Sequence, residues 1–170
     1  MINEFKATIA RRGGLSKTNR FDVMMSLPQG ITLSDRGRDL TMLCESAGIP
    51  GKQITTTEYD LYTHQRKFPT GFIQEDVTLI FNVTSDFYVK QIFDEWQGLV
   101  IKLDSFLLAY ESEYQVDLII RQLDENDDPI WTSTLIGAYP ITVNSLTLDN
   151  NSDNAVQKLS VTFAYTDIKK

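Results

Sequence analysis

The stretch that decides the fold is "GIPGKQITTTEYDLYTHQRKFPTG", residues 48–71. Between residues 54 and 68 it predicts a single β-strand that is long, polar and charged at its far end. Fifteen extended residues would span roughly 50 Å at about 3.3 Å per residue. Strands of small domains usually contain about five or six residues. We expect Pro69 and Gly71 to end this strand, and its length raises the question of what it pairs with.

Alternate side chains of a strand point to opposite faces, and the two faces of this segment differ. One face is mildly apolar and carries Thr55, Thr57, Tyr59, Leu61 and Thr63. The other is wet and mostly acidic and carries Thr56, Glu58, Asp60, Tyr62 and His64. A lone ribbon would expose unpaired backbone, which proteins rarely tolerate. The pattern leaves two arrangements open: closure with strands of other copies into one barrel, or a long hairpin folded back over its own domain.

The size and composition of the chain indicate one globular, mainly β domain. Its 170 residues are enough for one core, and 11% aromatic residues together with many Thr and Val favour strands. We expect no signal peptide and no membrane-spanning segment, and therefore no membrane partner. Cys44 is the only cysteine, which excludes an internal disulfide and a cysteine-based zinc site. Synthesis and assembly in a reducing cytoplasm fit this composition best.

The net charge of −7 is unevenly distributed along the chain. Residues 1–20 contain five basic residues and one acidic residue, a balance of +4, so the other 150 residues carry −11. Proteins that grip nucleic acid normally show a basic folded face, the reverse of this pattern. We expect a flexible basic arm over residues 1–19, hinged at Gly13 and Gly14, and a single domain over residues 20–170. The arm is either a solvated tail or a segment that docks on the acidic body of a neighbouring copy.

The rest of the chain predicts seven or eight strands and one substantial helix, so the expected fold is an all-β core with a packed helix. Besides the long segment, we expect strands over residues 21–28, 40–45, 76–84, 114–124, 130–140 and 156–167. The helix is expected over residues 86–98, with Ser85 as its N-cap and Gly98 at its end. Its apolar stripe consists of Val89, Ile92, Phe93 and Trp96.

Residues that carry catalysis are sparse, and we expect no enzyme activity, cofactor or metal. His64, the only histidine, is expected to be solvated, and Cys44 to be a small buried thiol. The acidic turn "DENDDP", residues 124–129, begins like a calcium loop, but Pro129 and Leu135 stand where glycine and glutamate belong. A hairpin turn built on Asp and Asn side chains is the better interpretation. A monomeric β-sandwich that binds carbohydrate or calcium remains the alternative from a different class.

Eight pieces of the sequence, taken in order, carry a family resemblance. They are "RFDVMM", "LCESAGIPG", "HQRKFPTG", "DVTLIFNVT", "FDEWQ", "LIIRQLD", "GAYPITVNSLTLD" and "VQKLSVTFAY". Together they resemble the tail tube proteins of contractile-tailed bacteriophages of the T-even type and, more distantly, the tube proteins of type VI secretion. The match runs from about Arg20 to Tyr165, and the order and spacing of the pieces make it specific.

The resemblance implies a small β-sandwich or barrel with a flanking helix, assembled into hexameric rings. Extended hairpins would join into a continuous inner β-barrel, and rings would stack into a hollow virion tail tube for genome delivery. The implied partners are other copies of the chain, the tail sheath, the tape-measure protein, the baseplate and the tail terminator. DNA would pass through the lumen without specific binding. A baseplate tube initiator and a type VI-like secretion tube are the alternatives within this architecture.

Two sets of residues acquire roles from this resemblance. Thr56, Glu58, Asp60 and Tyr62 would line the lumen. Ile49, Pro50, Gly51, His64, Arg66 and Lys67 are candidates for contacts between rings and subunits. Charge alone suggests that Arg66 and Lys67 meet an acidic turn such as residues 124–128 of the adjacent ring. DNA carries about one negative charge per 1.7 Å of duplex, so a wall bearing Glu58 and Asp60 would repel it weakly and let it slide.

Overall fold

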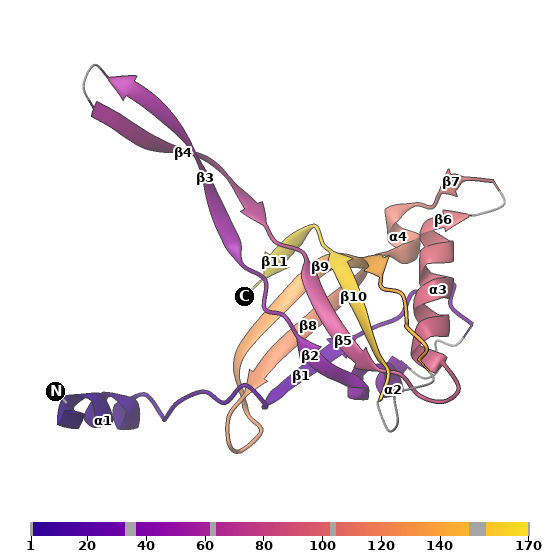
Figure 1. Ribbon diagram of the computed structural model, residues 1–170, viewed down its shortest axis with the longest axis horizontal. Coiled ribbons are helices and arrows are strands. Elements are labelled where there is room, and N and C mark those ends of the chain that lie inside the picture. The colour runs from indigo at the N-terminus through magenta and orange to yellow at the C-terminus, as the bar shows by residue number, and fades with distance from the viewer. Residues whose placement is uncertain (1, 33–36, 62–63, 103–104, 150–155, 170) are drawn as a thin grey trace.

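The computed structural model describes residues 2–32, 37–61, 64–102, 105–149 and 156–169. Figure 1 shows three parts: a β-rich body, a two-stranded hairpin that projects from it, and an N-terminal helix that stands apart. The body strands are β1 (Phe21–Met25), β2 (Cys44–Ala47), β5 (Val77–Asn82), β8 (Val116–Leu123), β9 (Pro129–Val143), β10 (Lys158–Ala164) and β11 (Asp167–Lys169). The hairpin consists of β3 (Lys52–Leu61) and β4 (His64–Gln74).

The remaining elements are four helices and a minor pair of strands. The helices are α1 (Ile2–Arg11), α2 (Gly37–Met42), α3 (Tyr88–Val100) and α4 (Glu111–Tyr114), and the short strands are β6 (Ile101–Lys102) and β7 (Leu107–Leu108). Within the described ranges, no helix combines the length and apolar character that a membrane span needs.

The body is one antiparallel sheet in the order β1-β8-β9-β10-β5-β2, and β11 also pairs with β9. The first part of β9 pairs with β8 and β11, and its last part pairs with β10. This change of partner occurs around Gly137, whose φ is +66°. A Cβ there would lie 2.9 Å from oxygen atoms of Gln115 and Thr166, so glycine lets one strand serve both halves of the sheet. The expected mainly β fold class is confirmed.

An aromatic cluster between α3 and the sheet forms the centre of the core. Phe81, Phe93, Trp96 and Phe163 are all fully buried, with ring centroids 5.2–6.2 Å apart. The indole N–H of Trp96 donates a hydrogen bond of 2.8 Å to the carbonyl of Tyr114, so its polar atom is satisfied inside the core. The predicted apolar stripe of α3 is therefore confirmed as the face that packs on the sheet.

The limits predicted for this helix are wrong at both ends. The helix begins at Tyr88, after Phe87 with φ 54°, and the Tyr88 N–H donates to Oδ1 of Asp86 rather than to Ser85. At the other end it continues past Gly98 to Val100. A Cβ on Gly98 would meet nothing within 4 Å, and the apolar residues after it extend the helix because they still pack against the core.

The strand predicted for residues 40–45 is also wrong, because this segment contains the end of α2 and the start of β2. Leu40 is buried and Leu43 half-buried, whereas Met42 is exposed. The spacing of three between Leu40 and Leu43 is typical of a helix. The segment is too short for its sequence to distinguish this spacing from the alternation of a strand.

Two further expectations differ from the structure. The chain over Ile2–Arg11 is the helix α1 rather than an irregular tail, so α3 is not the only substantial helix among the described residues. The strand predicted for residues 156–167 is divided into β10 and β11. Whether residues 1–19 and 20–170 behave as separate arm and domain stays a prediction.

Candidate functional site

The hairpin of β3 and β4 answers the question of what the long strand pairs with. Ten residue pairs join the two strands, from Lys52↔Gln74 at the base to Leu61↔His64 near the tip. This ladder is about 33 Å long at about 3.3 Å per residue. The prediction of one strand over residues 54–68 is wrong, because the chain reverses between Leu61 and His64 and pairs with itself.

The proline and glycine that were expected to end the strand lie inside β4. Thr56 pairs with Pro69 and Thr55 with Gly71, so the ladder skips Thr70 at a bulge. The hydroxyl of Thr70 donates to the carbonyl of Thr55 at 3.2 Å. Proline lacks the N–H of a ladder residue but is tolerated at a bulge or on an edge strand. The strand therefore continues past Pro69 and ends at Gln74.

The hairpin does not fold back over its own domain. Figure 1 shows it projecting from the body, and β3 and β4 form a two-stranded sheet of their own. Its apolar side chains are largely exposed, with Ile54 at 65% and Phe72 at 63%. Tyr59, Phe68 and Ile73 are exposed as well. An isolated two-stranded hairpin is marginally stable in water, and a contiguous exposed apolar surface marks an interaction site.

Along β3 the two faces alternate as predicted, but the placement of His64 on the acidic face is wrong: it pairs with Leu61, and Arg66 pairs with Tyr59, both positions of the face expected to be apolar. On one face the rings of Tyr59 and Phe68 meet edge to face, with centroids 5.7 Å apart. On the other face Lys67 lies opposite Glu58, with Nζ and Oε1 3.2 Å apart. Both charged groups are exposed, so the pair adds little stability, but it offsets the charge of Glu58. The face predicted to be mostly acidic therefore carries charges of both signs.

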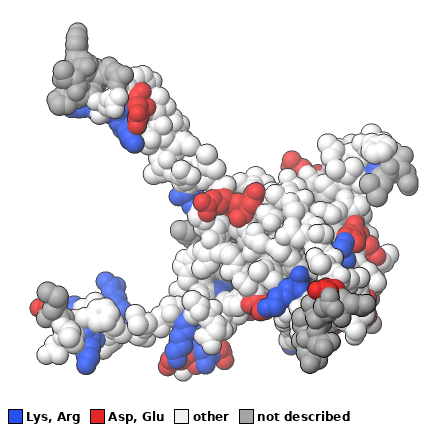
Figure 2. All heavy atoms as spheres, viewed as in Figure 1, with Lys and Arg blue, Asp and Glu red and all other residues white. Residues whose placement is uncertain are grey.

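For the other predicted lumen and tip residues, the structure gives at most the residue they pair with on the opposite strand. Asp60 lies opposite Gln65, and His64 opposite Leu61. Tyr62, like Thr63, lies outside the described residues. Figure 2 shows that the shaft of the hairpin is largely uncharged on the visible face, with charged atoms near the tip and at the base.

The predicted stacking residues fall into two groups that the structure does not bring together. Ile49, Pro50 and Gly51 connect β2 to β3 at the base of the hairpin, where the Glu75 N–H donates to the carbonyl of Gly51. Ile49 is exposed, and a Cβ on Gly51 would lie 2.7 Å from the Glu75 carboxylate. Lys67 pairs with Glu58, which lies seven residues beyond Gly51 along β3, about 23 Å away at about 3.3 Å per residue.

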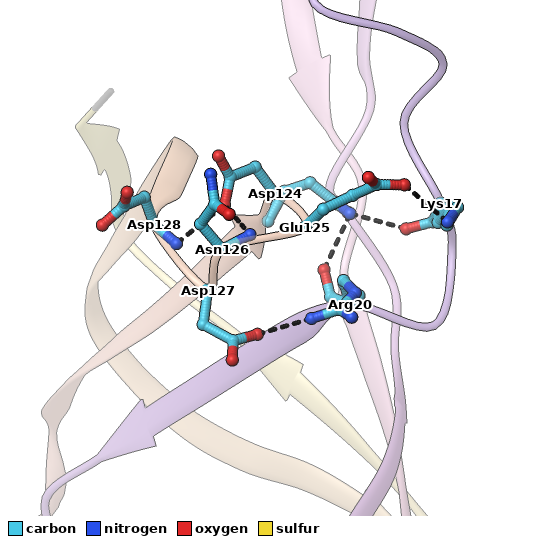
Figure 3. A network of polar contacts seen from close by, with 8 residues as sticks. Lys17, Arg20, Asp124, Glu125, Asn126, Asp127 and Asp128 are labelled. Atoms are coloured by element: carbon cyan, nitrogen blue, oxygen red, sulfur yellow. Dashed lines mark hydrogen bonds and ion pairs between the residues drawn. The ribbon is translucent and has the colours of Figure 1, made fainter.

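The acidic turn after β8 is held by its own side chains (Figure 3). Oδ1 of Asp124 accepts hydrogen bonds from the backbone N–H groups of Asn126 and Asp128, at 2.7 and 2.9 Å. Asp127 has φ 66°, a left-handed conformation that aspartate tolerates well. The predicted turn built on Asp and Asn side chains is confirmed. Among the described residues, no group of three or more His, Cys, Asp or Glu side chains is arranged to hold a metal ion.

Basic residues of the same chain meet this turn. Lys17 Nζ lies 2.6 Å from Oε1 of Glu125, and Arg20 Nη1 lies 2.7 Å from Oδ1 of Asp127 (Figure 3). The side-chain amide of Gln122 also donates to the carbonyls of Lys17 and Arg20. The hydrogen bond and charge of Lys17 lower the pKa of Glu125. These contacts fasten the root of the arm to the body, a role that charge counting did not reveal.

Cys44 lies half-buried in β2, where it packs against the core. Burial raises the pKa of its thiol to about 11, an effect partly opposed by a hydrogen bond with the backbone of Ser46. The thiol is therefore protonated near neutral pH and is a poor nucleophile. This environment favours the predicted packing role, although the side chain is less deeply buried than expected.

Comparison with known proteins adds an independent observation to this geometry. The family model described as "Phage tail tube protein" matches residues 16–169, nearly the whole chain. The chain belongs to the phage tail tube protein family. It is also 26% identical over 166 residues to the tail tube protein of Serratia phage KSP90, a match that covers 96% of this chain and 93% of the relative.

Solved structures with the same fold come from contractile injection systems. A chain of the anti-feeding prophage baseplate, described as 6-fold symmetrised, aligns with a TM-score of 0.68 and 14% identity over 91% of this chain and 94% of that one. A chain of the sheath-tube complex of an extracellular contractile injection system in the extended state aligns with a TM-score of 0.61 and 18% identity, over 91% and 90%. At these identities the likeness shows the fold.

This tail tube protein is thus a structural subunit of a phage tail and a component of the virion. The sequence drew attention to β3, but most of β4 was not expected to be a strand. Phe68, Phe72 and Ile73 of β4 carry much of the exposed apolar surface. The apolar residues of "FPTGFI", residues 68–73, could have indicated that the strand continues. They were not interpreted in this way because the strand was expected to end at Pro69.

Proposed function

We propose that this protein is the repeating subunit of a hollow tail tube, in which hairpins of neighbouring copies pair edge to edge into one inner β-barrel. The observation that carries the proposal is the projecting β3–β4 hairpin, which has exposed apolar side chains and no other strand beside it among the described residues. Each strand of a two-stranded ribbon leaves its outer backbone groups unpaired. Closure into a barrel pairs these groups and covers the apolar face.

The related assemblies support six copies per ring and contacts with other tail components. The baseplate that contains a similar fold is described as 6-fold symmetrised, and another similar chain belongs to a sheath-tube complex. Further similar chains come from a tube-terminating cap and a sheath/tube terminator. By analogy, our tube subunit would form hexameric rings and contact sheath, baseplate, terminator and tape-measure proteins after synthesis in the host cytoplasm.

In this tube the face with Thr56, Glu58, Asp60 and Tyr62 lines the lumen, and the Tyr59–Phe68 face packs on subunit bodies. Lys67 lies beside Glu58 on the lumen face, so acidic and basic groups alternate there. Phosphates of a passing genome then meet no continuous basic surface that would hold them. The protein's work is transport through a conduit, without catalysis.

Ring stacking uses the two ends of the hairpin. Ile49, Pro50 and Gly51 lie at its base, and His64, Arg66 and Lys67 lie toward its tip. Because the groups are separated along the hairpin, the base of one ring is placed to meet the tip region of the next. Contact between Arg66 or Lys67 and the acidic turn of residues 124–128 has less support, because Glu125 and Asp127 already bind Lys17 and Arg20.

Negative-stain electron microscopy of the purified protein at high concentration tests this function. The wild type is expected to form rings or hollow tubes. Ile73→Ser is expected to remain a folded monomer, because Ile73 lies opposite Gln53, on the face of the hairpin that carries Thr57 and Tyr59 and that barrel closure would cover. Met42→Ser is the matched control, since Met42 is also an exposed apolar side chain, at 69% on α2 against 54% for Ile73. Monomers of the wild type at every concentration, or tubes formed by Ile73→Ser, would contradict the proposal.

The second candidate is a tube initiator at the baseplate. It is favoured by the similarity to the baseplate chain of the anti-feeding prophage, with a TM-score of 0.68. The same surfaces would serve this role and a secretion-type tube. Length distinguishes them, because a repeating subunit extends into long tubes whereas an initiator stops at one ring. The family assignment leaves the monomeric carbohydrate- or calcium-binding module without support.

A further inference from the structure

The N-terminal helix α1 has an apolar face without a partner among the described residues. Ile2, Phe5 and Ile9 follow helical spacing on one side, and Ile2 and Phe5 are exposed to 73% and 64%. No residue of α1 is buried. Lys6 and Arg11 outweigh Glu4, so α1 carries a net positive charge. A ten-residue helix is marginal in isolation, so a stable α1 needs a surface on which to pack.

The helix α1 stands apart from the body of its own chain (Figure 1). The helix ends at Arg11 and is followed by Gly13 and Gly14, both with positive φ. The chain is next fastened at Lys17 and Arg20 on the acidic turn. In Figure 1, α1 lies at one end of the molecule and α3 at the other. A surface near α3 is therefore presented to the α1 of another copy rather than to its own.

Such a surface exists between the C-terminal part of α3 and β9. It is a groove of about 560 Å³ lined mainly by apolar residues, among them Val100, Ile101, Pro140 and Ile141. Ile101 and Ile141 are exposed to 44% and 41%, so the groove is open to a ligand side chain. Its length along one helix and its apolar lining suit a short amphipathic helix.

The charges around the groove are opposite to those of the arm. Asp94 lies on its rim and is paired with Lys90, while Glu95 accepts hydrogen bonds from Thr32. The helices α3 and α4 together still carry four carboxylates against one basic residue, a balance of −3. Residues 1–20 carry +4, but Lys17 and Arg20 are already paired with the acidic turn of the same chain, so a balance of +2 remains on the arm. This complementarity favours contact between arm and body, whereas repulsion between bodies would oppose assembly.

We propose that α1 of one subunit docks by Ile2, Phe5 and Ile9 into the α3–β9 groove of a neighbouring subunit, with its basic side chains facing the carboxylates of α3 and α4. This inference rests on the proposed assembly into rings and adds a second contact, on the subunit bodies. A basic amphipathic helix also suits an anionic membrane surface. The charge of −11 on the rest of the chain makes such a surface unfavourable.

Cross-linking between two differently labelled chains tests the docking. In a Cys44→Ala background, a Phe5→Cys chain is mixed with an Ile141→Cys chain and treated with a short bifunctional maleimide. The expected result is a cross-linked pair containing one chain of each kind. The matched control replaces Phe5→Cys by Ala7→Cys, which lies on the opposite side of α1, and is expected to give at least about tenfold less product.

Electron microscopy of the same samples separates the two proposals. Rings or tubes without the Phe5–Ile141 product, or equal product from the Ala7 control, would overturn the docking and leave the tube function intact. Monomers without product would overturn both. Binding of the wild-type chain to vesicles of phosphatidylserine and phosphatidylcholine, abolished by Phe5→Ser, would overturn the docking in favour of a membrane partner.

Discussion

The body and the hairpin are built from similar alternating sequences but complete their packing in different ways. In the body, alternate residues such as Leu79 and Phe81 are fully buried beneath α3. In the hairpin, Tyr59 alternates with Glu58 and Asp60 in the same way, yet it remains 58% exposed. Periodicity thus identifies the side that will be covered, but it does not reveal whether the cover comes from the same chain.

The largest expected effect is on the body. Trp96→Ala removes a fully buried side chain from the aromatic cluster and the hydrogen bond to Tyr114, and should destabilise the free protein by about 3–5 kcal/mol. Urea denaturation of the monomer measures this change. A loss below about 1 kcal/mol would mean that the cluster does not carry the stability of the free chain.

The matching change on the hairpin should separate folding from assembly. Phe68→Ala removes an exposed ring and its contact with Tyr59, so the free protein should lose less than about 1 kcal/mol. Assembly should fail or require a much higher concentration, because this ring belongs to the face that we expect neighbouring bodies to cover. Urea denaturation measures the stability of the free protein, and sedimentation measures its assembly. A large loss of monomer stability together with normal tubes would contradict the assignment of Phe68 to assembly rather than to folding.

The lumen face offers a change that should leave both folding and assembly intact. Glu58→Lys with Asp60→Lys makes this face basic, since Lys67 already lies beside Glu58. Tubes should still form, but DNA passage should slow or stall because phosphates now find adhesive contacts. The control, Glu58→Gln with Asp60→Asn, removes the acids without adding base. Normal ejection from particles with the double lysine variant would contradict the lumen assignment.

The smallest effect concerns the root of the arm. The pKa of Glu125 is lowered by Lys17, so its contribution to stability is present above its ordinary value of about 4.5 and is lost as pH falls through the lowered pKa. In Lys17→Ala the pKa of Glu125 should return toward that value, as an NMR titration of the carboxyl would show. Lys6→Ala, a change on α1, should leave it unaltered.

Much of the body could be predicted from the sequence, because local periodicity and tertiary packing agree there. The strand β5 and the buried stripe of α3 are examples. The reversal of the hairpin could not be predicted, since residues 62 and 63 are Tyr and Thr, not the Asn-Gly or Asp-Gly pair that marks a two-residue turn. The helix α2 was missed because six residues are too few to establish its period.

The geometry of the hairpin could be predicted only in part. The face alternation of β3 was readable, whereas the proximity of Lys67 to Glu58 depends on a cross-strand register that sequence spacing does not contain. Likewise, the contacts of Lys17 and Arg20 with the acidic turn join residues more than one hundred positions apart. Charge totals indicate attraction between arm and body without identifying the partners.

Hydrogen exchange of the backbone amides in β3 and β4, compared between free subunits and assembled tubes, tests most directly whether the hairpin is completed by other copies. In the free protein, the outward-facing amides of both strands should exchange rapidly while those of β5 and β10 are protected. On assembly, the hairpin amides should become as protected as the body strands, because neighbouring hairpins then pair with them. Protection already present in the monomer, or outward amides that still exchange rapidly in tubes, would contradict edge-to-edge pairing.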